Sequence, residues 1–256
     1  MSHTSAQSHG LRYSITMPGN SKLQAALLLV TVLAAMHSAS FAAQEEKLKQ
    51  ILQEKIPELK IEGVRESPII GLYEVVANSR VFYSDQMGRH VIIGNIINAT
   101  TQQNLTENRF NEINRIAISD LPFQHAIKIK NGNGKRIIAT FFDPNCSFCK
   151  KMSPELDKVP NATIYIFLQA TLSPDSVAKS EMILCSDNPP LAWKQWVQRG
   201  KIAARRTPCQ SAVIQELISL GKKLNIKGTP TTFLPSGERV EGFISGKDLT
   251  TRIDQM

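Results

Sequence analysis

The spacing of hydrophobic residues changes along the chain, and each change predicts a different element. In residues 43–60 the apolar positions recur every three or four residues, which predicts a short amphipathic helix that carries Leu48, Ile51, Leu52 and Ile56. Three strand-like runs follow, separated by the turn signals Asn78-Ser79 and Met87-Gly88; the runs are Tyr73–Val76, Val81–Tyr83 and Val91–Ile93. We therefore expect a small α+β domain, built on an antiparallel meander, over residues 43–104.

The next region, residues 105–122, has the pattern of a linker helix. Apolar residues at positions 110, 113, 116 and 117 predict a helix from about residue 106 to residue 118. Asp120 and Pro122 would end it, because the residue before a proline disfavours the helical conformation.

A strand, a turn and a helix follow in close succession. The largely apolar run Arg136–Phe142 is typical of a buried strand, and Asp143-Pro144-Asn145 is a turn and helix-start signal. The helix after it is predicted by the spacing of Phe148, Met152, Leu156 and Val159. Further helical patterning occurs at residues 174–185, 190–200 and 210–223.

The first 42 residues have the composition of a secretory signal peptide. They contain no Asp or Glu, and the basic residues Arg12 and Lys22 precede an apolar run that is short for a membrane span. Small residues then lead to a predicted cleavage site after Ala42. The residues leave two alternatives open, a true start at Met17 and an uncleaved membrane anchor. We expect an exported protein.

Composition and charge exclude several classes of protein. Hydrophobic residues at 42% and charged residues at 20% are ordinary globular values, which argues against a disordered chain. Thirty Lys and Arg against 22 Asp and Glu give a net charge of +8, but the basic residues are scattered, so we expect no nucleic-acid partner. His90 and His125 have no metal-ligand spacing, and we expect neither a metal nor a cofactor.

Two of the four cysteines form the motif Cys146-Ser147-Phe148-Cys149 at the start of a predicted helix. Unpaired N–H groups and the helix dipole stabilise a thiolate at Cys146, which becomes both a nucleophile and a leaving group. Cys149, one turn further along, would attack a mixed disulfide formed at Cys146. A permanent disulfide is the open alternative. A zinc site is less favoured, because Cys185 and Cys209 do not form a second close pair.

Taken together, these residues resemble the thioredoxin fold. The resemblance rests on the strand that leads into Phe142–Lys150, on Pro154 in the following helix, and on Gly228-Thr229-Pro230 before the strand-like run Thr231–Leu234. It implies that the Thr229–Pro230 bond is cis, that Pro230 shapes the active-site pocket, and that the Thr229 backbone pairs with an extended substrate. The sequence alone leaves a trans turn open.

The order of domains is similar to that of the periplasmic disulfide isomerases of the DsbC/DsbG family. This resemblance implies a cystatin-like N-terminal dimerisation domain at residues 43–104 and a thioredoxin-like catalytic domain at residues 123–256. It also implies a helical insertion at about residues 172–224 with a structural disulfide between Cys185 and Cys209, and a DsbD-type membrane reductant. A monomeric N-terminal module is the alternative that the pattern leaves open.

The function that the resemblance implies is thiol:disulfide interchange in the periplasm, without a cofactor. The chain would act as an isomerase or reductase on misoxidised exported proteins, with chaperone activity. A dithiol oxidase and a non-redox holdase chaperone are the alternatives. Ser147 and Phe148, expected to shape the active site, depart from the Gly-Tyr of DsbC-like sites and the Pro-Tyr of the DsbG type, which leaves redox potential and substrate range open.

Overall fold

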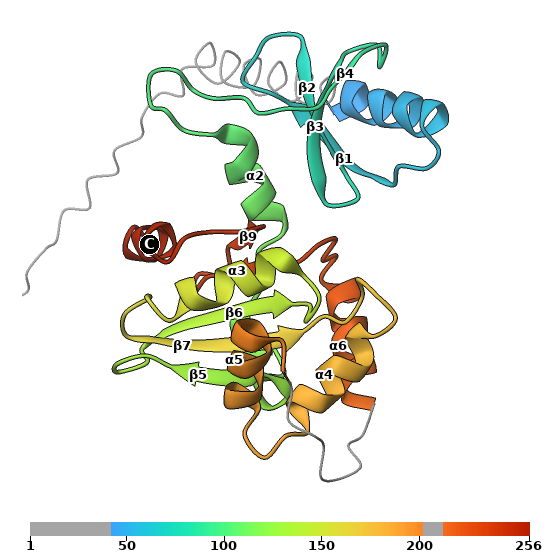
Figure 1. Ribbon diagram of the computed structural model, residues 1–256. Helices are drawn as coiled ribbons and strands as arrows, with labels where there is room; N and C mark the ends of the chain where they lie inside the picture. Colours follow the sequence, from blue (N-terminus) through green and yellow to red (C-terminus); the bar gives the residue numbers. More distant parts are fainter. Residues whose placement is uncertain (1–41, 202–211) are drawn as a thin grey trace, which may run out of the picture. The chain divides into compact units, whose positions relative to one another are not determined.

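The computed structural model describes residues 42–201 and 212–256, which form two compact units. Figure 1 shows the smaller N-terminal unit mainly in blue and cyan and the larger unit in green to red. Apart from Ala42, the predicted signal peptide lies outside the described residues, and its cleavage remains a prediction. No helix within the described ranges is both long and apolar enough to span a membrane.

The N-terminal unit combines one helix with a four-stranded sheet. The helix spans residues 42–55 and buries Leu48 and Leu52. The strands pair in sequence order as an antiparallel meander: β1 (Ile61–Glu66), β2 (Leu72–Ala77), β3 (Arg80–Asp85) and β4 (Val91–Ile92). The predicted α+β meander is confirmed, and the structure adds β1, which the sequence pattern had not indicated.

Both predicted turns of the meander contain residues with positive φ. Asn78 and Ser79, at φ 49° and 59°, join β2 to β3 in the two-residue turn that suits the twist of a hairpin. Gly88 has φ +60°, and a Cβ atom there would lie 3.0 Å from Ile51 Cγ2. The positive φ and the lack of room for a Cβ atom both favour glycine at this position.

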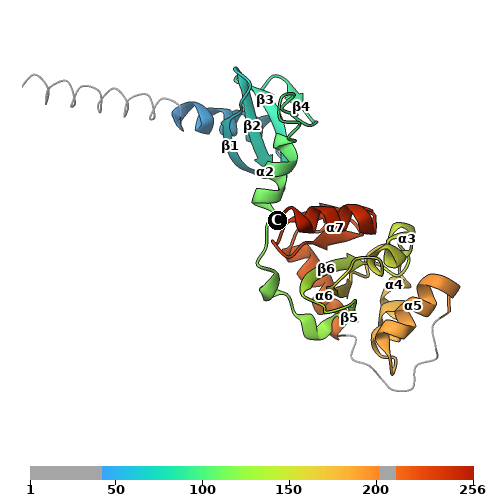
Figure 2. The ribbon, with the colours of Figure 1, turned by 90° about the vertical axis from the view of Figure 1, so that its left-hand side faces the viewer.

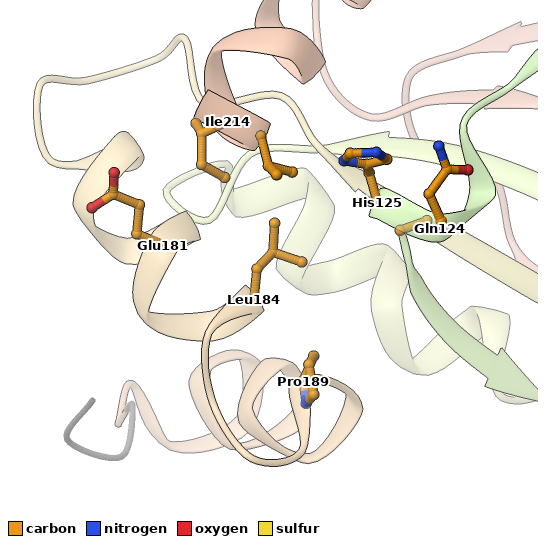
Figure 3. Close-up of a pocket in the computed structure, with 8 residues that line it drawn as sticks. Gln124, His125, Glu181, Leu184, Pro189 and Ile214 are labelled. Carbon is orange, nitrogen blue, oxygen red and sulfur yellow. The ribbon is translucent and has the colours of Figure 1, made fainter. Parts of the chain in front are cut away.

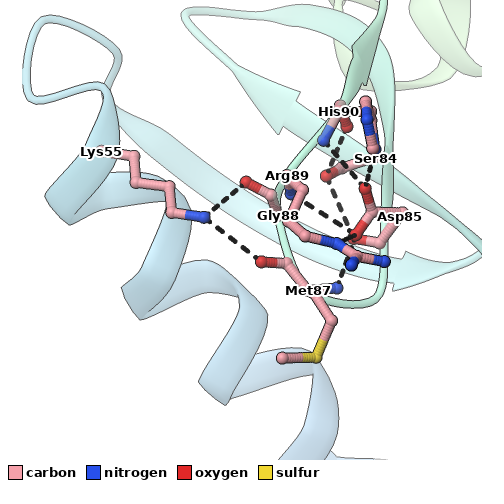
Figure 4. Close-up of polar contacts among 7 residues, drawn as sticks. All are labelled: Lys55, Ser84, Asp85, Met87, Gly88, Arg89 and His90. Atoms are coloured by element: carbon pink, nitrogen blue, oxygen red, sulfur yellow. Dashed lines mark hydrogen bonds and ion pairs between the residues drawn. The ribbon is translucent and has the colours of Figure 1, made fainter.

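The turn between β3 and β4 is held by Asp85 (Figure 4). Its carboxylate accepts hydrogen bonds from the backbone N–H groups of Met87 and His90, each at 2.8 Å, and lies 2.8 Å from His90 Nδ1. Partial burial alone would raise the pKa of Asp85, but these hydrogen bonds outweigh it and lower the pKa below its ordinary value. Lys55 Nζ donates to the Gly88 carbonyl at 2.9 Å, which ties the helix to the turn.

The linker helix is shorter than predicted. Helix α2 spans Leu105–Ile113, and two 3₁₀ turns, at Ile118–Asp120 and Phe123–His125, follow it in place of further helix. At the C-cap, the Phe110 carbonyl accepts both the backbone N–H of Asn114 at 3.1 Å and its side-chain NH₂ at 2.9 Å. The apolar spacing beyond residue 113 therefore does not continue the helix.

The larger unit is built on a five-stranded mixed sheet with the order β5-β7-β6-β8-β9. Strands β6 and β7 are parallel and the other pairs antiparallel. The strands are β5 (Ile127–Lys130), β6 (Arg136–Phe142), β7 (Ala162–Leu168), β8 (Thr231–Phe233) and β9 (Arg239–Glu241). The predicted buried strand over residues 136–142 is thus the central strand β6.

Helices cover both faces of this sheet. One face packs against α3 (Ser147–Leu156), α4 (Ser176–Leu184), α5 (Pro189–Arg199) and α7 (Gly246–Asp254), and the other against α6 (Ala212–Lys223). Figure 2 shows α3 and α7 side by side, and the Gly246 N–H donates to Glu155 Oε2 at 3.0 Å. Alternate residues of β6 pack on opposite faces of the sheet: Ile138 and Phe142 on the first face and Phe141 on the second. The predicted thioredoxin-like architecture with additional helices is confirmed.

Candidate active site

The turn that follows β6 is organised by the carboxylate of Asp143, which is fully buried. Oδ1 accepts from the Asn145 N–H and from the Ser176 hydroxyl, each at 2.8 Å. Oδ2 accepts from the N–H groups of Thr171 and Leu172, at 2.8 and 2.9 Å. Four donors satisfy the buried carboxylate and bind the turn to the segment that leads into α4.

Cys146 occupies the N-cap position of α3. Its Sγ accepts the N–H of Cys149 at 3.3 Å, and its thiol lies 3.1 Å from the carbonyl oxygen of Thr229. The residue is recessed, with 6% of its surface exposed. Because a helix N-terminus presents free N–H groups and a positive dipole end, this position suits a sulfur that carries negative charge.

Cys149 has a different environment from Cys146, although both are free thiols. It is 0% exposed, on the side of α3 that faces the core. Burial raises the pKa of the Cys149 thiol above its ordinary value, and the neighbouring Cys146 side chain raises it further. Cys146 therefore lies at the N-terminus of α3 and keeps a small exposed area, whereas Cys149 is a fully enclosed thiol.

Thr229 and Pro230 lie against the cysteine pair. The peptide bond between them is cis, and the Thr229 carbonyl contacts Cys146 Sγ as described. The Pro230 carbonyl accepts the N–H of Gly242 at 2.8 Å, which connects this loop to the end of β9. The structure thus brings Thr229 and Pro230 together with Cys146, as the resemblance implied.

Ser147 and Phe148, between the cysteines, are both exposed. Phe148 has the helical spacing of Met152 and Leu156, but its side chain is 58% exposed. The buried stripe consists of Cys149, Met152 and Leu156. Phe148 is therefore an apolar surface next to Cys146 and not part of the core.

Contacts from α4 and α5 reach the same turn, and the sequence pattern did not indicate them. The Trp196 indole donates to the Pro144 carbonyl, and Lys179 Nζ donates to Asn145 Oδ1. Trp193 is a core residue, whereas Trp196 is partly exposed.

The second cysteine pair is described only in part. Cys185 caps the C-terminus of α4 and is disulfide-bonded. Cys209 lies outside the described residues, so the pairing of the two remains a prediction.

A separate pocket of about 300 Å³ lies between α4, α5 and α6 (Figure 3). Among the described residues that line it, none belongs to the cysteine site; they are Gln124, His125, Ala126, Glu181, Leu184, Pro189, Val213 and Ile214. The candidate active site is therefore the surface around Cys146 and not this pocket.

Comparison with known proteins identifies the family. A disulfide bond isomerase N-terminal domain model matches residues 39–107, and a thioredoxin-like domain model matches residues 123–256. The chain is 33% identical over 212 residues to the probable thiol:disulfide interchange protein DsbC of Bordetella parapertussis, across 82% of this chain and 74% of that protein. The chain belongs to the DsbC family. It is also 26% identical over 237 residues to DsbC of Escherichia coli (strain K12), across 89% of this chain and 94% of that protein.

A solved disulfide interchange protein from Neisseria gonorrhoeae is 32% identical, with a TM-score of 0.49, and the likeness covers 53% of this chain and 97% of that one. Membership of the DsbC family makes the chain a thiol:disulfide interchange protein, that is, a thiol–disulfide oxidoreductase. Cys146 and Cys149 form its redox-active CxxC motif.

Proposed function

We propose that the chain is a periplasmic disulfide isomerase and reductase that acts on misoxidised exported proteins. Cys146 is the nucleophile and Cys149 the resolving cysteine. The observation that carries this proposal is the asymmetry of the two sulfurs. Cys146 caps the N-terminus of α3 and keeps 6% of its surface exposed, whereas Cys149 is fully enclosed and its pKa is raised by burial.

The reaction begins with attack by the Cys146 thiolate on a substrate disulfide. A bond forms between Cys146 Sγ and one substrate sulfur, and the other substrate sulfur leaves as a thiolate. If a second substrate thiolate then attacks the bonded substrate sulfur, Cys146 is released as a thiolate and the substrate has exchanged one disulfide for another. No net electron transfer takes place between protein and substrate in this isomerisation, because Cys146 begins and ends as a thiolate.

Reduction follows when Cys149 resolves the mixed disulfide instead. Cys149 loses its proton and attacks Cys146 Sγ, the substrate leaves as a thiolate, and two electrons pass from the protein to the substrate. The raised pKa of Cys149 makes its thiolate scarce, and so prolongs the mixed disulfide. A long-lived mixed disulfide favours isomerisation. A DsbD-type membrane reductant would restore the dithiol.

The surroundings of Cys146 suit an unfolded substrate chain. Exposed Phe148 offers an apolar surface beside the sulfur, with Ser147 next to it. Thr229 and Pro230 form the opposite wall, where the Thr229 backbone pairs with an extended segment of substrate. The same apolar surface supports the chaperone activity that the family resemblance implies.

The N-terminal unit would dimerise the protein. Strand β4 lies at the edge of the sheet, and the residues along and after it expose apolar side chains: Val91, Ile92, Ile93 and Ile97. An exposed apolar edge is a liability in a monomer, and pairing with a second copy would cover it. Sedimentation velocity should show a dimer that Ile93→Asp dissociates and the exposed control Leu191→Asp does not. A wild-type monomer would refute this part of the proposal.

The isomerase function is tested by recovery of activity from a scrambled multi-disulfide protein in a mildly reducing buffer. The intact chain should restore activity, and Cys146→Ser should restore none. Cys149→Ser should retain part of the isomerisation, since a substrate thiol can replace its step. Rapid oxidation of a reduced substrate without recovery from the scrambled form would identify an oxidase. Suppression of aggregation that survives Cys146→Ser, without any recovery, would identify a holdase.

A further inference from the structure

Helix α5 places an indole hydrogen bond on the turn that precedes the nucleophile. The Trp196 Nε1–H donates to the carbonyl oxygen of Pro144 at 2.6 Å, two residues before Cys146. Trp196 and Pro144 are 52 residues apart in sequence, so the bond joins α5 directly to the start of α3. The carbonyl lies outside any strand or helix, and the indole supplies the donor that it needs.

Two lysines lie over the same indole ring. Lys150 Nζ is 4.3 Å and Lys179 Nζ 4.8 Å from the ring centroid, within the range of a cation–π interaction. Lys150 is the residue after Cys149, and its backbone N–H donates to the Cys146 carbonyl at 3.1 Å. The indole ring is thus in contact with ammonium groups from two helices, α3 and α4.

Asn145, directly before Cys146, is held by α4 and the residues before it. Its Oδ1 accepts from Lys179 Nζ at 2.6 Å, and its Nδ2 lies 2.7 Å from Ser173 Oγ and 2.9 Å from Ser176 Oγ. Asp175 Oδ1 accepts from the same Nδ2 at 2.8 Å, and Asp175 Oδ2 pairs with Lys179 Nζ. Both residues that precede the nucleophile are therefore fixed by side chains of α4, α5 and the segment before α4.

We propose that Trp196 is a positioning residue that, with Lys150 and Lys179, sets the redox equilibrium of the Cys146–Cys149 pair. The indole holds Pro144 so that Cys146 stays at the N-cap, where the Cys149 N–H bonds its sulfur. The Lys150 ammonium adds positive charge near the turn, whereas the Lys179 ammonium is paired with Asp175 and holds Asn145 in place. Both effects stabilise the reduced, thiolate-bearing form over the disulfide. The proposal deepens the proposed function at the same site.

The test is the equilibrium of each purified full-length variant with glutathione. Two glutathione thiols reduce the Cys146–Cys149 disulfide to the dithiol and become one glutathione disulfide, so atoms and electrons balance. Trp196→Phe keeps an aromatic ring for the lysines but removes the Nε1–H donor. Since one hydrogen bond contributes about 0.5–1.5 kcal/mol, the equilibrium should move about three- to tenfold toward the protein disulfide. A tenfold shift corresponds to about 30 mV.

Trp193→Phe is the matched control. It makes the same chemical change on the same helix, but the Trp193 indole donates to Ser153 Oγ at 3.0 Å, within α3 and away from the turn. Its equilibrium should stay within about twofold of wild type, even if the variant loses more thermal stability. Lys150→Met leaves the indole bond intact, and should shift the equilibrium in the same direction as Trp196→Phe but by less. It tests the proposal even if Trp196→Phe fails to fold.

The outcomes separate a positioning role from a structural one. An unchanged equilibrium in Trp196→Phe, or an equal shift in Trp193→Phe, would overturn the proposal, and so would an unchanged equilibrium in Lys150→Met if Trp196→Phe does not fold. The measurement requires only that the cysteines exchange with glutathione, and not that the chain isomerises a protein. A failed isomerase assay together with a shifted equilibrium would reject the proposed function and leave the role of Trp196 standing.

Discussion

Replacement of Asp143 by Asn tests how strongly the buried carboxylate organises the active-site turn. Asn offers one carbonyl oxygen and one NH₂ group, so two of the four hydrogen bonds are lost. If the NH₂ takes the place of Oδ2, it faces the N–H donors of Thr171 and Leu172. A buried donor without an acceptor costs about 1–3 kcal/mol, so the two donors together should cost about 2–6 kcal/mol. Against a typical total stability of about 5–15 kcal/mol, this is a large change.

Urea unfolding followed by tryptophan fluorescence suits this measurement, because both tryptophans of the chain lie in α5 and report on the thioredoxin-like unit. Asp157→Asn is the control: it makes the same change at an exposed position one residue beyond α3, and should alter the free energy of unfolding by less than about 0.5 kcal/mol. A loss below about 1 kcal/mol for Asp143→Asn would refute the reasoning, since it would mean that the four hydrogen bonds are readily replaced.

Three further predictions concern other parts of the chain. Phe148→Ser should slow the reaction with an unfolded protein disulfide but not with a small disulfide such as oxidised glutathione, and should leave thermal stability unchanged because the ring is exposed; stopped-flow rates and a melting curve check both. Cys149 should react with iodoacetamide at least about tenfold more slowly than Cys146 at pH 8, because burial and a raised pKa disfavour its thiolate; peptide mass spectrometry distinguishes the two sites, and equal rates would contradict the assignment. Asp85 has a depressed pKa in the folded state, so its contribution to stability is present above the unfolded value of about 3.9 and is lost as the pH falls through the folded value. Hydrogen exchange of residues 85–90 should therefore be faster in Asp85→Asn than in wild type at pH 6, with a difference that shrinks toward pH 2.

Local sequence patterns predicted the structure correctly where it depends on residues that are close together in sequence. The apolar run of β6, the Asp143-Pro144-Asn145 turn and the cysteine spacing predicted a strand, a turn and a helix in the positions observed. Strand β1 was missed because its apolar residues, Ile61 and Val64, are three positions apart and do not alternate. A hydrophobic pattern along the sequence does not reveal such a strand, because it is the pairing with β2 that defines it.

The parts of the site that sequence could not predict depend on contacts between distant segments. Trp196 and Lys179 reach the catalytic turn from 52 and 34 residues away, and no periodicity encodes such a pairing. The contact of the Thr229 carbonyl with Cys146 Sγ was implied by resemblance alone, since nothing in a Thr-Pro pair indicates which distant residue lies beside it.

The most direct test of the central claim is to trap the mixed disulfide. In Cys149→Ser the resolving sulfur is absent, so only a substrate thiol can release a substrate bonded to Cys146, and the mixed disulfide should persist longer. Incubation with a scrambled substrate, acid quenching and peptide mass spectrometry should locate the cross-link at Cys146. Accumulation should be greater than in the intact chain. A cross-link at another cysteine, or none in Cys149→Ser while the intact chain remains active, would contradict the assignment of nucleophile and resolving cysteine.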